Sequence, residues 1–505
     1  MPEPIERDAA ARVAVIGGGW AGLAAAVRLS EAGITCAVFE AAKNLGGRAR
    51  HVPWQTSDGR AIALDNGQHI LIGAYRHTLG LLSRLGVNLD DAFERTPLQI
   101  VSTGGFEWRA SAHRAPWHLV WGVLRARKLN LDERWAMVSF ALRARRIDWA
   151  LATDCSVDAL LDAWEQPATL CRKLWEPLCI ATLNTTSDIA SAQVFLNVLR
   201  DSLGSEARNS DLLLPHVDLG SLLPDAAAAF LTCRARAVSE IRLGARIQNL
   251  KVEEHSVSIA SGSATDLTGA ERFDGAVLAV PPHEAARLLA PTALRDTRYR
   301  PLIASCETFE FQPIVTAYLQ YREPPQWPAR MLALEAAPHL DLFGQWAFNR
   351  SERLDDRDAH KPNAPRGLVA VVISADGPHR ELEQAELLAT IAKQLATQCG
   401  MPSQPLDSRL IFEKRATFAC TPALLRPDID TPHPHLVIAG DFVAEAEPTT
   451  HYPATLEAAV ISGQRAAESL IAALSSSQRD RDAQMPPVTD PTAAHRAPRR
   501  SAKPR

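Results

Sequence analysis

Three glycines and one acidic residue near the start of the chain have the types and the spacing that suit phosphate and ribose binding. Gly17, Gly19 and Gly22 form a GxGxxG turn after the apolar run VAVI, and Glu40 follows 18 residues after Gly22. In such a turn the first glycine permits a tight bend, the second admits a pyrophosphate and the third lets a helix pack on a strand. The helix start attracts phosphates, while a carboxylate at position 40 can bind ribose hydroxyls and repels a ribose phosphate. These residues therefore predict a dinucleotide cofactor other than NADP.

A second glycine pair lies just beyond the predicted strand that ends at Glu40. The segment LGGRAR contains Gly46, Gly47 and Arg48, and it resembles the GGR segment that extends the dinucleotide motif in the amine oxidase and phytoene desaturase flavoproteins. That resemblance implies FAD, with the glycines passing close to its diphosphate and Arg48 lying beside the flavin or its phosphate. It also implies that the loop DNGQH carries Gln68 past the flavin ring. Because no Cys or His close to the GGR segment suits a covalent link, the FAD is expected to be noncovalent.

The C-terminal part of the chain carries motifs that fit the same cofactor. The run LVIAGD places Gly440 and Asp441 at the end of a predicted strand, where the carboxylate can bind a ribityl or ribose hydroxyl. The run PATLEAAVISG predicts a helix with proline in its first turn. Thr455 and Leu456 would lie at this start, whose N–H groups and dipole stabilise the negative charge of a reduced flavin. By the same resemblance, Ile247 would contact the adenine through its backbone.

The predicted elements alternate in a way typical of an α/β protein. Residues 13–40 predict strand, helix and strand, residues 81–224 are mainly helical by periodicity, and residues 225–300 return to strands and helices. The resemblance implies an FAD-binding Rossmann-type domain of the two-dinucleotide-binding kind with an inserted α+β substrate domain. The expected division is an N-terminal extension at 1–11, an FAD-binding domain formed by 12–80, 225–300 and 430–475, a substrate domain formed by 81–224 and 301–429, and a disordered tail at 476–505. Because the FAD-binding domain is assembled from distant pieces, neither half of the chain is expected to fold alone.

The composition is that of a globular protein with two domains. The chain has 505 residues, 46% of them apolar and 22% charged, and its net charge of −4 gives no sign of nucleic-acid binding. Its eight cysteines include no CxxC pair, which argues against zinc or a redox disulfide, and we expect no metal ligands. The first ten residues lack a secretory pattern, and no apolar stretch of about 20 residues predicts a spanning helix. A cytoplasmic protein is therefore expected, with peripheral contact at the inner face of the cytoplasmic membrane left open.

Four longer segments resemble one particular group of proteins within this family. They are DNGQHILIGAYR (65–76), KLWEPLCIATLNTTSDIASAQVFLNVL (173–199), LLLPHVDLGSLLPDAA (212–227) and GDFVAEAEPTTHYPATLEAAVISG (440–463). They resemble the squalene-associated flavoproteins of bacterial hopanoid synthesis, and the similarity spans residues 12 to about 470. This resemblance implies reductive removal of the allylic hydroxyl of hydroxysqualene to give squalene, with hydride from reduced flavin. It further implies a lipophilic C30 isoprenoid substrate, NADPH or another external reductant, and squalene-forming partner enzymes.

Loss of a hydroxyl group is assisted by a proton donor, and no sequence pattern identifies that donor here. The candidates are polar residues in segments expected near the flavin ring. They are His69, whose imidazolium could act as an acid near neutral pH, and the pair His451 and Tyr452 before the C-terminal helix. Gln68 and Asn184 are further candidates, and Asn184 has a helix cap as its alternative role. Water must be excluded from the reacting carbon, which predicts an apolar channel of Leu, Ile, Phe and Trp side chains.

A cluster of basic and tryptophan residues lies between positions 106 and 146. It contains nine Lys or Arg against three acidic residues, interleaved with Trp108, Trp117, Trp121 and Trp135. The run APWHLVWGVLRARKL has the pattern of an interfacial helix, and an insoluble substrate is best drawn from a bilayer. These helices are therefore expected to face a membrane. The alternative is an amphipathic helix packed on its own domain with solvated arginines.

Three other functions remain open on the sequence. The same flavin site would serve a carotenoid or other isoprenoid desaturase, because the residues around the ring do not fix the direction of hydride flow. An amine oxidase usually needs an aromatic cage around the amine, and only Tyr452 is an obvious member. A non-enzymatic alternative is a flavin-binding scaffold for squalene-forming enzymes.

Overall fold

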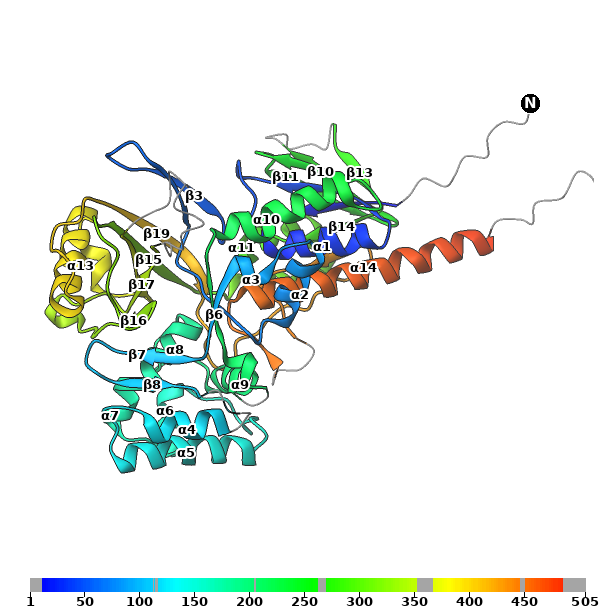
Figure 1. The fold of residues 1–505 in the computed structure, drawn as a ribbon. Coiled ribbons are helices and arrows are strands. Elements are labelled where there is room, and N and C mark those ends of the chain that lie inside the picture. Colours follow the sequence, from blue (N-terminus) through cyan, green and yellow to red (C-terminus); the bar gives the residue numbers. More distant parts are fainter. Residues whose placement is uncertain are drawn as a thin grey trace, which may run out of the picture.

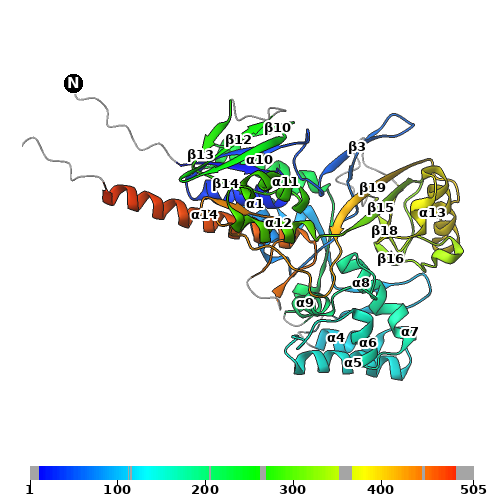
Figure 2. The same ribbon diagram turned by 180° about the vertical axis from the view of Figure 1, so that it is seen from behind.

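The computed structural model describes residues 11–111, 113, 117–203, 206–261, 269–351, 367–445 and 450–484. These residues form a parallel sheet with its covering layers, a second sheet of antiparallel strands, and a group of helices at one end of the molecule (Figures 1 and 2). Residues 1–10 of the expected N-terminal extension and residues 485–505 of the expected tail lie outside the described residues.

The parallel sheet has five strands in the order β10-β2-β1-β14-β20. Its strands are β1 (Arg12–Ile16), β2 (Thr35–Glu40), β10 (Glu240–Leu243), β14 (Gly275–Leu278) and β20 (Leu436–Ile438). All neighbouring pairs in the sheet are parallel. The central strands are short apolar runs because both of their faces are covered. This one sheet therefore joins segments from the beginning, the middle and the end of the chain.

Alternate residues of the central strand β1 pack on different layers. Val13 and Val15 belong to a core shared with the helices α1 (Trp20–Glu31), α10 (Leu219–Ala229) and α14 (Leu456–Gln484). Ala14 and Ile16 belong to a core shared with the antiparallel strands β11 (Ile247–Glu253), β12 (Ser256–Ser261) and β13 (Glu271–Phe273). The helix α11 (Pro282–Ala293) follows β14, as the sequence predicts. The two-residue period of a strand thus positions a helical layer on one face and a small sheet on the other.

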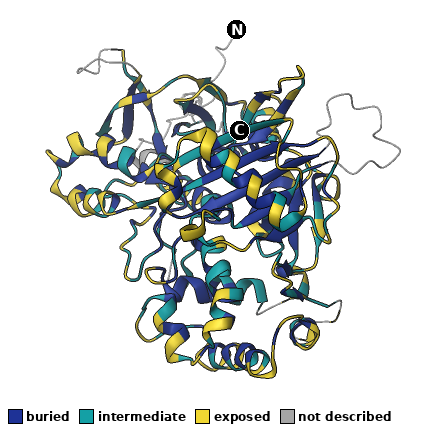
Figure 3. Cartoon of the chain, turned by 90° about the vertical axis from the view of Figure 1, so that its left-hand side faces the viewer, coloured by how far each residue is buried: buried dark blue, intermediate teal, exposed yellow. Residues whose placement is uncertain are grey.

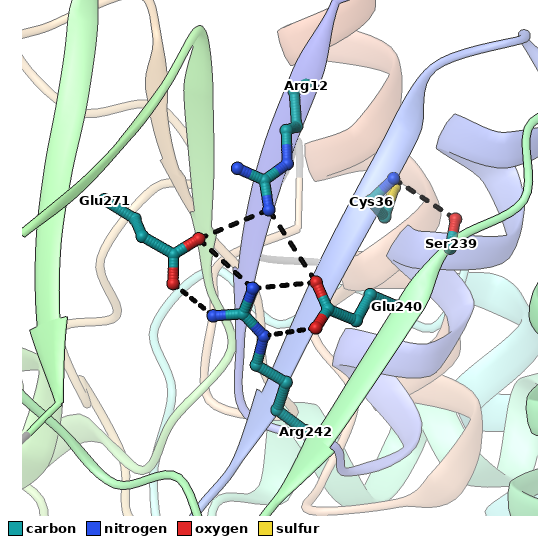
Figure 4. Close-up of polar contacts among 6 residues, drawn as sticks. All are labelled: Arg12, Cys36, Ser239, Glu240, Arg242 and Glu271. Atoms are coloured by element: carbon teal, nitrogen blue, oxygen red, sulfur yellow. Dashed lines mark hydrogen bonds and ion pairs between the residues drawn. The ribbon is translucent and has the colours of Figure 1, made fainter.

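A network of half-exposed ion pairs joins the parallel sheet to the small sheet (Figure 4). Arg12 of β1 lies 3.3 Å from Glu271 of β13 and 3.7 Å from Glu240 of β10. Arg242 of β10 pairs with both Glu240 and Glu271. Because these side chains remain solvated, each pair adds little to the unfolding free energy, and the network mainly fixes the relative position of the strands.

The second sheet has the strand order β16-β17-β18-β15-β19 and lies beside the first (Figure 1). Its strands are β15 (Phe311–Gln320), β16 (Met331–Ala333), β17 (Trp346–Asn349), β18 (Leu368–Ser374) and β19 (Asp407–Phe418), and helix α13 (Gln384–Cys399) covers one face. Val315, Ala317 and Leu319 of β15 share a core with Leu387 and Ile391 of α13. The alternation along β15 therefore accounts for the position of α13.

The helical part occupies the end of the molecule away from the β11–β13 sheet (Figures 1 and 2). It consists of α4 (Trp117–Arg125), α5 (Leu131–Arg146), α6 (Val157–Ala163), α7 (Ala168–Leu170), a π-helical turn (Cys171–Trp175), α8 (Glu176–Leu183) and α9 (Ala192–Leu203). Figure 3 shows the sheets in the buried interior and exposed residues on the outer sides of the helices. Within the described ranges, no helix is both long and apolar enough to cross a membrane.

The prediction that residues 81–224 are mainly helical is confirmed over 117–203, whereas on both sides of that range short strands lie between the helices. Four short strands lie there: β6 (Phe93–Thr96), β7 (Gln99–Val101), β8 (Glu107–Arg109) and β9 (Leu212–Pro215). Strand β9 pairs with β6 and with β5 (Leu71–Ile72), and β7 pairs with β8. Runs of three or four residues have too few repeats for periodicity to distinguish a strand from a helix, and distant pairing partners decide their structure. The remaining strands and α-helices of the described residues are the hairpin β3 (His51–Gln55) and β4 (Ala61–Asp65), and the helices α2 (Arg76–Arg84), α3 (Leu89–Ala92) and α12 (Arg300–Glu307).

The last helix differs from its prediction at both ends. Helix α14 begins at Leu456, so the proline at position 453 precedes the helix and does not lie in its first turn. The hydroxyl of Thr455 accepts the N–H of Ala458 at 3.2 Å and caps the helix start. The helix continues to Gln484, so the expected disordered tail from residue 476 begins with nine helical positions.

Candidate functional site

The GxGxxG turn is packed too tightly for any side chain at two of its glycines. Gly17 has φ +112°, and a Cβ atom there would lie 2.1 Å from the carbonyl oxygen of Ala279, just beyond β14. A Cβ atom on Gly22 would lie 1.9 Å from the carbonyl oxygen of Gly17. The first and third glycines therefore allow β1, α1 and the end of β14 to meet.

The second glycine pair lies directly against this turn. The N–H of Gly46 donates to the carbonyl oxygen of Gly18 at 2.8 Å, and a Cβ atom on Gly47 would approach the Cα of Gly19 to 3.2 Å. Helix α1 starts here without a side-chain cap and without an acidic residue in its first turn. The uncapped N–H groups and the bare backbone around them suit a diphosphate.

Glu40 ends β2 beside the turn, as the sequence predicts. Its two carboxylate oxygens accept the N–H groups of Gly18 and Ala42, each at 2.7 Å. Each oxygen keeps a lone pair that can accept a ribose hydroxyl. The chain leading into β11 passes over Glu40, because the N–H of Ala245 donates to the Glu40 carbonyl oxygen at 2.8 Å. Ile247 begins β11 two residues later and is buried, which places it near the expected adenosine end.

Arg48 and Asp441, predicted from opposite ends of the chain, form an ion pair. The Arg48 guanidinium donates to Asp441 Oδ1 at 2.6 Å and to the carbonyl oxygen of Ala416 at 2.8 Å. Asp441 is buried, and the N–H of the preceding Gly440 donates to Ser462 Oγ of α14 at 2.9 Å. The structure therefore brings the N-terminal and C-terminal cofactor motifs to one place. The contact of Arg48 with a flavin stays a prediction.

A buried carboxylate that the sequence analysis did not single out lies at the start of α14. Both oxygens of Glu457 are engaged, one with the N–H of His77 and the other with the N–H of Thr78, each at 2.9 Å. These are N–H groups in the first turn of α2, which has no cap of its own. Glu457 therefore ties the start of α2 to the start of α14, and no local spacing in the sequence signals this contact.

His69 lies in the predicted loop but is not positioned as an acid. Its Nδ1 lies 2.7 Å from the carbonyl oxygen of Gly67, and burial, with help from the charge of Arg48, lowers the pKa of His69 to about 4. The expectation of an imidazolium at neutral pH is therefore wrong, because desolvation favours the neutral ring. In the adjacent Gln68, Nε2 donates to the carbonyl oxygen of His69, while Oε1 is buried without a partner among the described residues. A buried acceptor without a partner indicates that a bound ligand donates a hydrogen bond at this position.

The segment before α14 carries the other two candidates. Burial, together with the charge of Arg426, lowers the pKa of His451 to about 4, so this histidine is also neutral at pH 7. Its carbonyl oxygen accepts Asn197 Nδ2 of α9 at 3.0 Å, and the carbonyl oxygen of Tyr452 accepts Arg426 at 2.6 Å. Burial raises the pKa of Tyr452, so its phenol keeps its proton. Among the candidates, Tyr452 therefore has a phenol that can donate a hydrogen bond above neutral pH.

Asn184 is a structural residue. It ends α8 with φ +48°, a left-handed conformation that Asn tolerates, and its amide bonds the backbone N–H of Ala375 and the hydroxyl of Thr417. The helix-cap alternative is therefore confirmed for this residue.

The depressed pKa values of His69 and His451 predict a loss of stability in acid. The pKa of each ring is 6.5 in the unfolded chain and about 4 in the folded protein. Between these two pH values the unfolded state therefore binds more protons than the folded state. The unfolding free energy therefore falls as the pH drops from 6.5 towards 4, and neither ring contributes above that window. Thermal unfolding measured from about pH 7 to about pH 4 tests this. His69→Gln should reduce the slope, while the exposed His255→Gln serves as control; equal slopes in both variants would contradict the prediction.

A parallel sheet with two glycine turns at its central strand and an acidic residue at the end of the next strand defines a dinucleotide-binding fold. Residues 20–471 match the family described as flavin containing amine oxidoreductase, and the chain belongs to this family. It is thus a flavin-dependent oxidoreductase.

Two curated relatives and one solved structure extend this comparison. The chain is 28% identical over 470 residues to a hydroxysqualene dehydroxylase of Rhodopseudomonas palustris, covering 91% of this chain and 98% of that protein. It is 27% identical over 467 residues to a protein of the same name from Sinorhizobium fredii, covering 90% and 97%. A structure of putrescine oxidase bound to putrescine matches with a TM-score of 0.65 and 19% identity over 92% of this chain and 99% of that chain. The last comparison confirms the predicted fold.

Proposed function

We propose that the protein removes the allylic hydroxyl of hydroxysqualene and delivers hydride to the same carbon, with noncovalently bound FAD as cofactor. The observation that carries this proposal is the similarity to proteins named hydroxysqualene dehydroxylase over nine-tenths of this chain and nearly all of theirs. The reaction consumes hydride and one proton and releases squalene and water. NADPH or another external reductant resupplies the electrons.

The residues of the described site fit a flavin dinucleotide. The glycine turns and the uncapped start of α1 suit the diphosphate, and the carboxylates of Glu40 and Asp441 suit hydroxyl groups of the sugar and the ribityl chain. The unpartnered Oε1 of Gln68 can accept a hydrogen bond from the ring. When bound and reduced, the flavin supplies the hydride; this chain must orient the substrate, exclude water and assist loss of the hydroxyl.

Two features of the chain serve these tasks. The neutral side chains of His69 and His451 and the phenol of Tyr452 offer hydrogen bonds without placing a charge that would repel an allylic cation. Next to Asp441, the ring of Phe442 packs edge-on against Phe309, with centroids 5.7 Å apart. This buried aromatic pair excludes water from the backbone next to Asp441. Hydrogen-bond donation from the phenol of Tyr452, which keeps its proton, to the leaving hydroxyl is the role that fits this set best.

An anaerobic product assay tests the proposal. Purified holoprotein is incubated with hydroxysqualene and dithionite, and the extract is analysed for squalene; parallel samples contain NADPH, no reductant, or protein stripped of flavin. Squalene is expected with dithionite and not without reductant or flavin. Absence of squalene with reduced holoprotein would overturn the proposal. Conversion of a carotenoid precursor to a more unsaturated product by oxidised holoprotein would instead favour the desaturase alternative.

A further inference from the structure

Helices α4 and α5 expose large apolar side chains on one stripe each. On α4, Trp117, Trp121 and Leu124 are 61, 40 and 57% exposed, at the spacing i, i+4, i+7. On α5, Leu131, Trp135 and Leu142 are 82, 67 and 57% exposed, at the spacing i, i+4, i+11. These spacings place each set on one side of its helix. We call these six side chains the α4–α5 apolar face.

The helices that carry this face are firmly attached to the protein. On the other side of α5, Met137, Phe140 and Ala144 are buried, and Phe140 stacks on Trp175 with centroids 4.4 Å apart. Arg134 of α5 donates to carbonyl oxygens at the end of α4, including that of Val123 at 2.6 Å. The buried side of α5 therefore packs against the protein, and its opposite side, which carries the apolar side chains, stays exposed.

Exposed basic residues lie at the C-terminal ends of the two helices that carry the α4–α5 apolar face. The exposed charged side chains of residues 117–148 are five cations and two carboxylates: Arg125, Arg127, Lys128, Arg145, Arg146, Asp132 and Asp148. Arg125 lies over the ring of Trp121, with its guanidinium carbon 5.4 Å from the ring centroid. Exposed Trp and Leu side chains bordered by Lys and Arg are typical of segments that bind the interface of an anionic bilayer.

We infer that the α4–α5 apolar face docks on the surface of an anionic membrane. A second copy of the chain is the less suitable occupant, because a two-fold contact would bring the same cations of both copies together. In a bilayer the apolar side chains enter the headgroup region while the cations meet lipid phosphates. The docking itself is independent of the proposed function.

Packed side chains link the α4–α5 apolar face to the candidate site. The role of this link in substrate entry rests on the proposed function. Trp175 packs edge-on against Phe195 of α9, with centroids 6.5 Å apart, and Asn197 of α9 donates to the carbonyl oxygen of His451. The helical part thus holds the apolar face and the segment before α14 in one packed unit. A membrane-dissolved isoprenoid would enter from this end of the molecule.

Vesicle flotation tests the docking. Full-length holoprotein is floated with phosphatidylcholine vesicles that contain phosphatidylglycerol and with vesicles of phosphatidylcholine alone. Binding to the anionic vesicles is expected, and it should weaken at high salt. The triple variant Arg125→Glu, Arg127→Glu, Lys128→Glu should lower the partition coefficient by at least roughly 100-fold. The control triple Arg295→Glu, Arg300→Glu, Lys393→Glu reverses exposed cations elsewhere and should bind as the unmodified protein does.

A second variant pair tests the apolar contribution. Leu131→Ser should weaken binding, whereas Leu294→Ser, at an isolated leucine that is 84% exposed, should leave it unchanged. Equal flotation of test and control variants, or failure of the unmodified protein to bind anionic vesicles, would overturn the inference. So would light scattering that shows a dimer converted to monomer by the α4 and α5 variants. Turnover of detergent-dispersed substrate should be unaffected by these variants, and its absence in every sample would count against the proposed function alone.

Discussion

Gly22→Ala is expected to yield a protein that retains much less flavin after purification than the unmodified protein does. The added Cβ atom would lie 1.9 Å from the Gly17 carbonyl oxygen, which is backbone and cannot rotate away. Gly17 cannot move back either, since it already faces the carbonyl oxygen of Ala279. Overpacking of about 1–3 kcal/mol would then displace the turn and weaken flavin binding by roughly 10- to 100-fold. The ratio of visible flavin absorbance to protein absorbance measures the loss.

The control for this variant is the same substitution in α2. A Cβ atom on Gly80 would meet only the flexible end of Arg84, at 3.9 Å. Gly80→Ala should therefore keep its flavin and gain up to about 1 kcal/mol in unfolding free energy from helix propensity. Circular dichroism of both variants separates loss of flavin from loss of fold. A folded Gly22→Ala protein with full flavin content would show that the turn is not the cofactor cradle.

Glu457→Ala is expected to lower the unfolding free energy by about 1–3 kcal/mol, because two N–H groups lose their acceptor and the buried one is left unsatisfied at about that cost. These are the N–H groups of His77 and Thr78, and Glu457 itself is only 2% exposed. Burial raises the pKa of Glu457, and the two hydrogen bonds from the backbone oppose that rise. Chemical denaturation of the holoprotein measures the effect.

Two further variants define the origin of this effect. Glu457→Gln keeps one acceptor oxygen and should fall between the unmodified protein and the alanine variant. Glu468→Ala removes a carboxylate from the same helix, where it pairs with Arg28 at 3.3 Å and is 58% exposed, and should cost less than about 1 kcal/mol. Equal stability of the Glu457→Ala and Glu468→Ala proteins would refute the assigned role.

The sequence predicts best those features that depend on neighbouring residues. The strand, turn, helix and strand from β1 to β2 are confirmed, because their apolar periods and glycine positions are local signals. The meeting of Arg48 with Asp441 spans 393 positions and could be expected only through the family resemblance. The protonation of His69 depends on burial, which no spacing reveals, and the role of Glu457 depends on where α2 and α14 meet. The sequence of α4 and α5 shows the Trp and Arg pattern. Only the structure shows which side chains of these helices are exposed and which are packed against the protein.

The parallel sheet also has a consequence for the order of events during synthesis. The N–H of Arg12 donates to the carboxylate of Asp274 at 2.8 Å, across 262 positions, and the edge strand β20 ends only at Ile438. When β1 leaves the ribosome, its partner β14 has not been translated, so the apolar faces of β1 and β2 have nothing to cover them. Nascent chains should therefore recruit chaperones, and prosthetic-group insertion should occur only after the last helix has emerged.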